Sequence, residues 1–253
     1  MNFPTWSDLN DESIVPPLGA RKAPDLGPVA VMAACQPDIP ILVSSMDQPR
    51  SHPFFNDRLM TDDQISLAGP SMGSPYAAMM LESLVIRGVE TIAVLGWCGA
   101  VNSTLKAGDI ILADPAIIDE GTSRNYARLV QDPAMASPDA GLTEHLLQFA
   151  QARMPDRTIS RQTVWTTDAI YRETPKKVAF FRELGADAVE MECSALFSVA
   201  EYRKVKIAAL LVVSDSLGDK KWQPGFKKEA FKAARKAACR TIIEFAKQLA
   251  SGC

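Results

Sequence analysis

Short apolar runs alternate with longer amphipathic segments from Pro28 to the end of the chain. Runs rich in Val, Ile, Leu and Ala predict buried strands at 28–34, 65–69, 91–97, 108–118 and 206–216. Apolar positions at helical spacing predict helices at 74–88, 142–154, 174–185 and 226–250, and the segment 187–204 is predicted to pass from a short strand into a helix. Strands that alternate with helices are typical of an α/β domain with a largely parallel sheet.

Two of the predicted helices begin and end with the same residue types. Each starts with a hydroxyl side chain as N-cap followed by proline, and each stops at a glycine: Ser74, Pro75 and Gly88 in one, Thr174, Pro175 and Gly185 in the other. The closing helix is expected to bury one apolar face, made of Phe226, Ala230, Phe231, Ala234, Ala238, Ile242, Phe245 and Leu249.

Composition narrows the class of protein. With 253 residues, 47% of them hydrophobic, the chain can build one sizeable core, and we expect an N-terminal arm at 1–27 and one domain at 28–253. A net charge of -3 without a basic run predicts no nucleic-acid partner. The sequence contains neither an apolar stretch of the roughly 20 residues that span a bilayer nor a secretion signal, so we expect a cytoplasmic protein that does not bind membranes.

Cysteine and histidine are too sparse to suggest a metal centre. The five cysteines show no paired spacing and the two histidines lie far apart, so neither a zinc site nor any other metal site is predicted. Cys98 and Cys193 lie in apolar segments, where a small buried thiol is the usual interpretation. Catalysis by cysteine is therefore not expected.

Unusual sequences follow three of the predicted strands. They are the glycine-rich turn 69–75, the segment 96–99 and the segment 214–216, and in such a sheet ligands gather at the carboxyl ends of strands. Each also has a structural interpretation, because glycines serve backbone geometry and Asp215 can terminate a turn. Neither a P-loop nor a dinucleotide-binding motif is present.

The segment 187–196, DAVEMECSAL, raises a question of charge, because Glu190 and Glu192 lie in a stretch otherwise suited to burial. An ionised carboxylate is costly to bury unless it is paired or hydrogen-bonded. Either the two acids point to solvent, or they cap the next helix, or the site requires them.

Taken together, GPSMGSPYAAMMLESLVIRGVETIAVLGWCGAV, VEMECSALFSVA and VVSDS, in this order, resemble the nucleoside phosphorylase/nucleosidase superfamily. That group contains hexameric purine nucleoside phosphorylases, uridine phosphorylases and methylthioadenosine nucleosidases, and VEME followed by a helix is its most specific mark. The resemblance covers residues from Pro28 to the C-terminus. It implies a single α/β domain with a mixed, distorted central β-sheet flanked by helices, a small-molecule nucleoside as substrate, and a homodimer or homohexamer.

The resemblance also implies roles on the sugar side. Glu192 would accept hydrogen bonds from the ribose 2′ and 3′ hydroxyls, and Met191 would pack on the sugar. Glycosidic cleavage passes through an oxocarbenium-like sugar, which a nearby carboxylate stabilises. Glu190 would support this acid or lie on the base side, and Met72 and Gly73 of the glycine turn would complete the sugar pocket.

On the base side, Asp215 matches the family's purine-side acid, with Ser214 beside it. An aspartate with a free pKa of about 3.9 can donate a proton there only if its surroundings raise that pKa. Uridine phosphorylases use Gln and Arg where this chain has Thr174 and Lys176, so the resemblance favours a purine-type base. Residues expected to line the base pocket are Ile170 and Tyr171, with Trp165 as a further candidate.

The chain departs from the family where phosphorylases bind phosphate. The arginine-containing GDPxR motif is replaced by AACQPD, and R-[VI]-G-[ST] is replaced by the segment 94–97, whose Gly96 and Trp97 are still expected to line the substrate site. A phosphate dianion needs charge-assisted donors, which valine and tryptophan lack. A third family arginine, from the neighbouring subunit, aligns near Pro53.

Two molecules can therefore accept the sugar in the reaction. Water can replace phosphate, with Glu190, Gln36 or Asp38 as its partners, or phosphate can be a co-substrate held by Arg50, Arg58 or Arg124. No other cofactor is expected. The sequence thus predicts an enzyme that cleaves nucleoside N-glycosidic bonds, a phosphorylase (pentosyltransferase) or a nucleosidase. The alternative is a nucleoside-binding protein that has lost catalysis.

Overall fold

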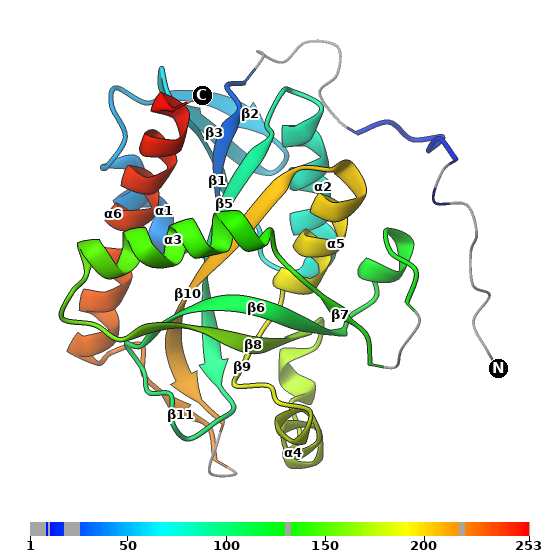
Figure 1. Ribbon diagram of the computed structural model, residues 1–253, viewed down its shortest axis with the longest axis vertical. Helices are drawn as coiled ribbons and strands as arrows, with labels where there is room; N and C mark the ends of the chain where they lie inside the picture. Colours follow the sequence, from blue (N-terminus) through cyan, green and yellow to red (C-terminus); the bar gives the residue numbers. More distant parts are fainter. Residues whose placement is uncertain (1–8, 10, 18–25, 130–132, 218–220, 253) are drawn as a thin grey trace.

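The computed structural model describes residues 9, 11–17, 26–129, 133–217 and 221–252. In this part of the chain, a mixed β-sheet of eleven strands is surrounded by α-helices, which is the predicted α/β architecture (Figure 1). The division into an arm and a domain stays a prediction, because much of the arm lies outside the described residues.

The sheet is built around four parallel strands. They are β4 (Ser66–Gly69), β1 (Val29–Ala33), β5 (Thr91–Ala100) and β10 (Lys206–Ser216), in that spatial order. A hairpin of β2 (Arg50–Phe54) and β3 (Asp57–Thr61) extends the sheet antiparallel beyond β4. Two-residue strands β7 (Met135–Ala136) and β11 (Gln223–Pro224) pair with β6 and β10.

Five of the strands form a closed ring. From β10 the pairing passes to β6 (Ile110–Asp119), to β8 (Ile159–Thr167) and to β9 (Ala188–Glu190), and β9 then pairs with β5, which pairs with β10. This closure mixes parallel and antiparallel pairs and brings the ends of β5, β9 and β10 together. It explains the distortion of the sheet and creates the place where the candidate site lies.

Helices cover both faces of the sheet. One face carries α1 (Ile39–Val43), α3 (Ala140–Arg153) and α6 (Glu229–Ser251), and the other carries α2 (Ser74–Val85) and α5 (Cys193–Arg203), while α4 (Pro175–Glu183) packs near β8 and β9 (Figure 1). Alternate residues of a strand point to opposite faces. Thus Val29 and Val31 pack with the first group of helices, and Ala30 and Met32 pack with the second.

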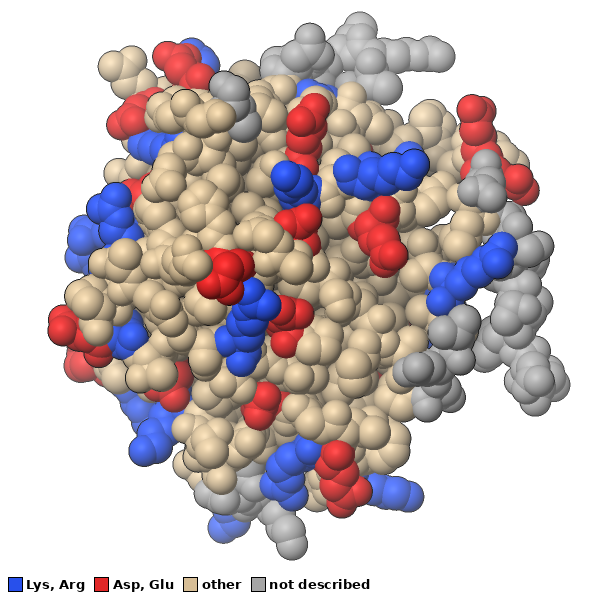
Figure 2. Space-filling view, in the orientation of Figure 1, with Lys and Arg blue, Asp and Glu red and all other residues tan. Residues whose placement is uncertain are grey.

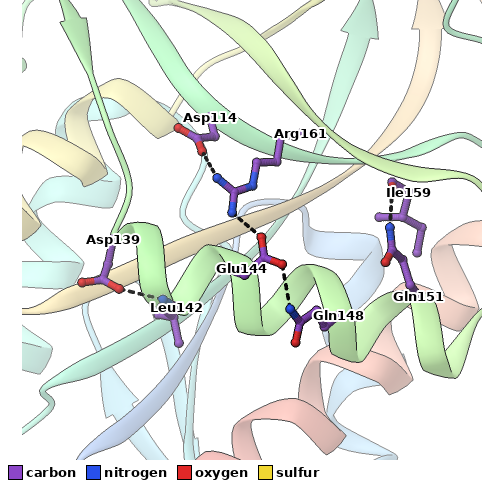
Figure 3. A network of polar contacts seen from close by, with 8 residues as sticks. All are labelled: Asp114, Asp139, Leu142, Glu144, Gln148, Gln151, Ile159 and Arg161. Atoms are coloured by element: carbon purple, nitrogen blue, oxygen red, sulfur yellow. Dashed lines mark hydrogen bonds and ion pairs between the residues drawn. The ribbon is translucent and has the colours of Figure 1, made fainter.

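Polar contacts fasten α3 to the sheet (Figure 3). The Asp139 carboxylate caps the helix by accepting a hydrogen bond from the Leu142 amide at 2.7 Å. The Arg161 guanidinium on β8 bridges Asp114 at 3.2 Å and Glu144 at 2.6 Å. These ion pairs are partly exposed, so each contributes at most about 1 kcal/mol, and the apolar face of α3 supplies most of its attachment.

Capping by Thr174 is confirmed, whereas capping by Ser74 is wrong. Thr174 accepts a hydrogen bond from the Lys177 amide at 3.3 Å at the start of α4. At α2 the N-cap is Gly73, and the Ser74 hydroxyl instead donates to the Met191 carbonyl at 2.7 Å. A long-range partner has therefore taken the hydroxyl that local sequence assigned to the helix.

The closing helix begins later than predicted. Phe226 and Ala230 are exposed, because the first of them precedes α6 and the second lies in its first turn. The β2–β3 hairpin was not predicted, since its polar and charged residues form no apolar run.

Charge is spread over the surface without a basic patch on the face viewed in Figure 2, where Lys and Arg are interspersed with Asp and Glu. Within the described ranges, no helix is both long and apolar enough to cross a membrane.

Candidate functional site

The two acids of the VEME segment have different partners. Glu190, the last residue of β9, accepts hydrogen bonds from the Thr166 hydroxyl and from the amides of Glu192 and Cys193, both at 2.7 Å. These amides lie at the start of α5, where backbone donors have no partner within the helix. Glu190 therefore holds the strand-to-helix turn in place, which is the capping role that the sequence left open for the pair.

Glu192 is free of that role. Its side chain is 6% exposed, and its Oε1 accepts a hydrogen bond from the Gly73 amide at 2.6 Å. Gly73 has a φ of 88°, a conformation that favours glycine, and this directs its amide toward the acid. The Ser74–Met191 hydrogen bond ties the same two segments together. The glycine turn and the VEME turn thus form one unit around the Glu192 carboxyl.

Burial changes the protonation of this pair. It raises the pKa of Glu192 to about 8, with a further contribution from the neighbouring Glu190 carboxylate. Burial also raises the pKa of Glu190, but the Thr166 hydroxyl and two backbone amides oppose the rise. The donors around Glu190 favour its ionised form, and the Glu190 carboxylate in turn disfavours ionisation of Glu192.

Asp215 lies at the end of β10, next to an irregularity in the pairing with β5 between Val213 and Asp215. Its two carboxylate oxygens accept hydrogen bonds from the Ser214 hydroxyl at 2.6 Å and from the Trp222 indole at 2.7 Å. Gly99 on β5 faces it, and a Cβ built on this glycine would lie 3.3 Å from Asp215 Oδ2. A Cβ at this position would make a tight contact with the carboxylate, so glycine gives Asp215 room beside the neighbouring strand.

Strand register places Asp215 near β9, the strand that leads into the Glu192 turn. Asp215 is paired with Gly99, and Gly99 is paired with Val189, so Asp215 and Val189 lie about two strand spacings, or about 10 Å, apart. Glu192 follows Val189 by three residues. Burial raises the pKa of the Cys98 thiol, and the Glu190 and Asp215 carboxylates both add to the rise, so this thiol is within electrostatic reach of both acids.

The residues expected to line the base pocket differ widely in exposure. Ile170 and Tyr171 lie in a short 3-10 turn, η3 (Ile170–Arg172), and are 51% and 97% exposed. Lys176 is exposed on α4. Trp165 is fully buried, stacks on Phe181 at 4.2 Å and donates its indole N–H to Asp119 at 3.0 Å. Trp165 is therefore a core residue and does not line an open pocket, contrary to expectation.

A second acid lies near Asp215. Burial raises the pKa of Glu173 to about 7, the Asp215 carboxylate adds to the rise, and Lys177 opposes it. Lys177 in turn forms an ion pair with Asp119 at 2.8 Å. The part of the site expected to bind the base thus contains the carboxyl groups of Asp215 and Glu173, with the Lys177 ammonium group nearby.

Two of the three residues proposed as partners for water, Asp38 and Glu190, already bind other groups of the protein. Asp38 is fully buried, accepts a hydrogen bond from the Trp97 indole at 2.8 Å, and forms an ion pair with Arg235 of α6 at 3.0 Å. Burial raises the pKa of Asp38 to about 6, although Trp97 and Arg235 oppose the rise. Glu190 is committed to α5, and Gln36 has an exposed side chain.

The arginines proposed for phosphate take part in other contacts. Arg50 and Arg58 belong to the β2–β3 hairpin, where Arg50 pairs with Asp63 and Arg58 donates to Ser51. Arg124 lines a cavity of about 840 Å³ beside Tyr202 and Arg203, at the opposite end of α5 from Glu192. Within the described ranges, no cluster of three or more His, Cys, Asp or Glu side chains could hold a metal ion.

Several neighbours of the candidate acids were not predicted. Thr166, Gly99 and Trp222 contact Glu190 or Asp215, and Cys35 and Glu173 interact with Glu192 and Asp215 electrostatically. Glu173 could have been suspected from its place beside Thr174 in the base-side segment. Sequence carries no signal for Trp222, since its contact depends on how the chain turns after β10. The exposed Met72 and half-buried Met191 flank the Glu192–Gly73 contact along the chain.

The amino-acid sequence of the chain is similar to those of known proteins. Residues 28–247 match the phosphorylase superfamily. The chain is 31% identical over 153 residues to a guanosine phosphorylase from Halorubrum lacusprofundi, covering 60% of this chain and 61% of that protein. It is 32% identical over 156 residues to a DeoD-type purine nucleoside phosphorylase from Colwellia psychrerythraea, covering 61% and 64%. The aligned part is less than two thirds of either relative.

Solved structures with the same fold extend over more of the chain. A 5′-methylthioadenosine/S-adenosyl homocysteine nucleosidase from Campylobacter jejuni superposes with a TM-score of 0.74 at 20% identity, covering 88% of this chain and 99% of that one. A purine nucleoside phosphorylase from Toxoplasma gondii gives 0.73 at 17% identity, covering 94% and 99%. At these identities the likeness concerns the fold.

Proposed function

The chain belongs to the phosphorylase superfamily, and on that premise we propose that it is an enzyme that cleaves the N-glycosidic bond of a nucleoside, by phosphorolysis or hydrolysis. The observation that carries this proposal is the placement of Glu192. Its carboxyl group is buried and is not used to cap α5, and it follows by three residues Val189, which lies two strands from Asp215. Burial of this acid carries an electrostatic penalty, and a role in the reaction explains that penalty.

On the sugar side, Glu192 binds the ribose hydroxyls and stabilises the sugar cation. With its pKa near 8, Glu192 is largely protonated in the free protein at neutral pH. Positive charge that develops on the ribose favours the ionised carboxylate, so the attraction is strongest in the transition state. Met191, Met72 and Gly73 supply the surroundings of the sugar, and Glu190 keeps the turn that aims Glu192.

On the base side, Asp215 receives the departing base. Ser214 and Trp222 fix the orientation of its carboxylate, which then faces N7 of a purine as negative charge develops on the ring. Ile170 and Tyr171 lie on the neighbouring turn and cover the base. A purine-type base is supported by Asp215 and by the names of the relatives, which are guanosine and purine nucleoside phosphorylases.

The test is an assay for free base with a panel of nucleosides, in the presence and absence of phosphate. Glu192→Ala and Asp215→Asn are each expected to lower turnover by several orders of magnitude while the far-UV circular dichroism spectrum stays unchanged. Glu201→Gln, an exposed acid on the same helix as the VEME turn, serves as the control and should retain activity. Near wild-type turnover in both site variants contradicts the proposal.

A second candidate function is a nucleoside-binding protein without catalysis. It is favoured by Val94 and Trp97, which lie where the sequence comparison expects charged or hydroxyl groups for phosphate. Calorimetric binding of a nucleoside without any release of base would support this alternative. A homodimer or homohexamer is expected in either case, and light scattering measures it.

A further inference from the structure

The Glu192 carboxyl has other neighbours besides Gly73, whose amide donates to it. The Cys35 thiol follows β1, and burial, Glu192 and Asp38 all raise its pKa, so this thiol lies within electrostatic reach of both acids. The Trp97 backbone acts on the same thiol through a hydrogen bond. The Ala33 carbonyl, two residues before Cys35, accepts a hydrogen bond from the Ser71 amide of the glycine turn, and Gly73 of the same turn donates to Glu192, so this end of β1 adjoins the Glu192 turn. Cys35, together with the contacting group of Asp38, Trp97 and Arg235, is called the acceptor wall.

Trp97 is locked within this wall. Its indole N–H donates to the fully buried Asp38, and its ring meets Phe231 edge-on at 5.1 Å. The Arg235 guanidinium lies 5.6 Å from the centre of the same ring. A rotation of Trp97 would break a buried charge-assisted hydrogen bond and would separate these rings, so the indole is a fixed part of the site.

The wall offers no free positive charge to an anion. Arg235 is the cation that reaches it within the described part of the chain, and Asp38 neutralises Arg235 through the ion pair. Glu190 and Glu192 on the adjoining side add acidic groups. A phosphate dianion placed here would be desolvated next to carboxyl groups without a charge-assisted donor to compensate.

From this geometry we infer that water is the molecule that accepts the sugar, so that the chain is a nucleoside hydrolase. In this enzyme Trp97, held in place by its hydrogen bond to Asp38, excludes phosphate. This inference rests on the proposed function. In the reaction the bond between C1′ and the base nitrogen breaks, and its electron pair stays with the base. The water oxygen bonds to C1′, one water hydrogen remains on the new hydroxyl, and the other balances the proton that the base acquires.

The full-length wild-type protein allows a direct test. It is incubated with inosine, guanosine and adenosine in oxygen-18 water, with and without saturating inorganic phosphate. We expect free ribose that carries oxygen-18 at C1′, and a rate of base release that phosphate changes by less than about twofold. Ribose 1-phosphate, with base release that requires phosphate, overturns the inference but leaves the proposed function standing. Release of no base from any nucleoside overturns both.

A pair of variants tests the reason given for phosphate exclusion. Trp97→Ser combined with Asp38→Asn removes the indole and frees Arg235. This double variant is expected to become phosphate-sensitive, with base release changing at least tenfold on addition of phosphate. Trp97→Phe keeps an aromatic ring of similar bulk and leaves Asp38 charged, so it should stay insensitive. A folded double variant that is as indifferent to phosphate as the wild type contradicts the role of the wall.

Discussion

Replacement of Glu192 by glutamine tests whether burial of an ionised carboxylate at this position lowers the free energy of unfolding. The side chain is 6% exposed, and burial followed by repulsion from Glu190 raises its pKa from 4.5 to about 8. At 1.36 kcal/mol per pH unit, this rise corresponds to a free energy on the order of 5 kcal/mol. Glutamine has nearly the same shape and can still accept the hydrogen bond from Gly73, but it cannot ionise.

The sign of the effect follows from proton binding. Between about pH 4.5 and pH 8 the unfolded chain has released the Glu192 proton while the folded chain retains it. The free energy of unfolding of the wild type therefore falls as pH rises through this window, and it levels off above pH 8. The glutamine variant lacks this contribution, so its stability relative to the wild type should increase with pH.

Urea denaturation of both proteins, at about pH 5 and about pH 8, measures the difference. We expect the gap in the free energy of unfolding to grow by several kcal/mol in favour of the variant. Glu201→Gln, on the exposed side of α5, should follow the wild type at both pH values. If the difference in the free energy of unfolding between the wild type and Glu192→Gln is the same at both pH values, the acid is not buried as described and the reasoning is refuted.

The same variant should lose roughly a hundredfold or more in kcat/KM, since a neutral amide cannot neutralise the ribose cation.

Three further perturbations probe the surroundings of the site. Glu190→Ala should destabilise the fold by about 3 kcal/mol, because two α5 amides and the Thr166 hydroxyl lose their acceptor, and a thermal shift assay measures this. Arg235→Met leaves Asp38 buried without its cation and should lower stability by about 3–5 kcal/mol above pH 6, but less near pH 5, where Asp38 is protonated; equal losses at both pH values would contradict the ion pair. Glu173→Gln should remove a titration near pH 7 from the pH dependence of kcat/KM, and an unchanged profile would exclude this acid from the base side.

Much of the fold was predictable because local sequence and tertiary structure agree. The strand predicted at 206–216 coincides with β10, and Thr174 caps α4 as expected, since both signals depend on nearest neighbours in the chain. The β2–β3 hairpin was missed because its stability comes from pairing with β4 and not from an apolar run of its own. Ser74 was assigned to the wrong partner for a similar reason, because its acceptor is 117 residues away.

By itself, the sequence determined most of the alternation of strands and helices, though not the β2–β3 hairpin or β8, and it determined the glycine turn before α2 and the presence of two neighbouring acids before α5. It could not separate Glu190 from Glu192, because a distance of two residues along the chain does not say which carboxyl receives the helix amides. Tertiary structure decided this through Thr166 and Gly73, which come from other segments of the chain. It also decided that Asp38 is locked to Trp97 and Arg235, since a buried charge can be satisfied only by partners that folding brings to it.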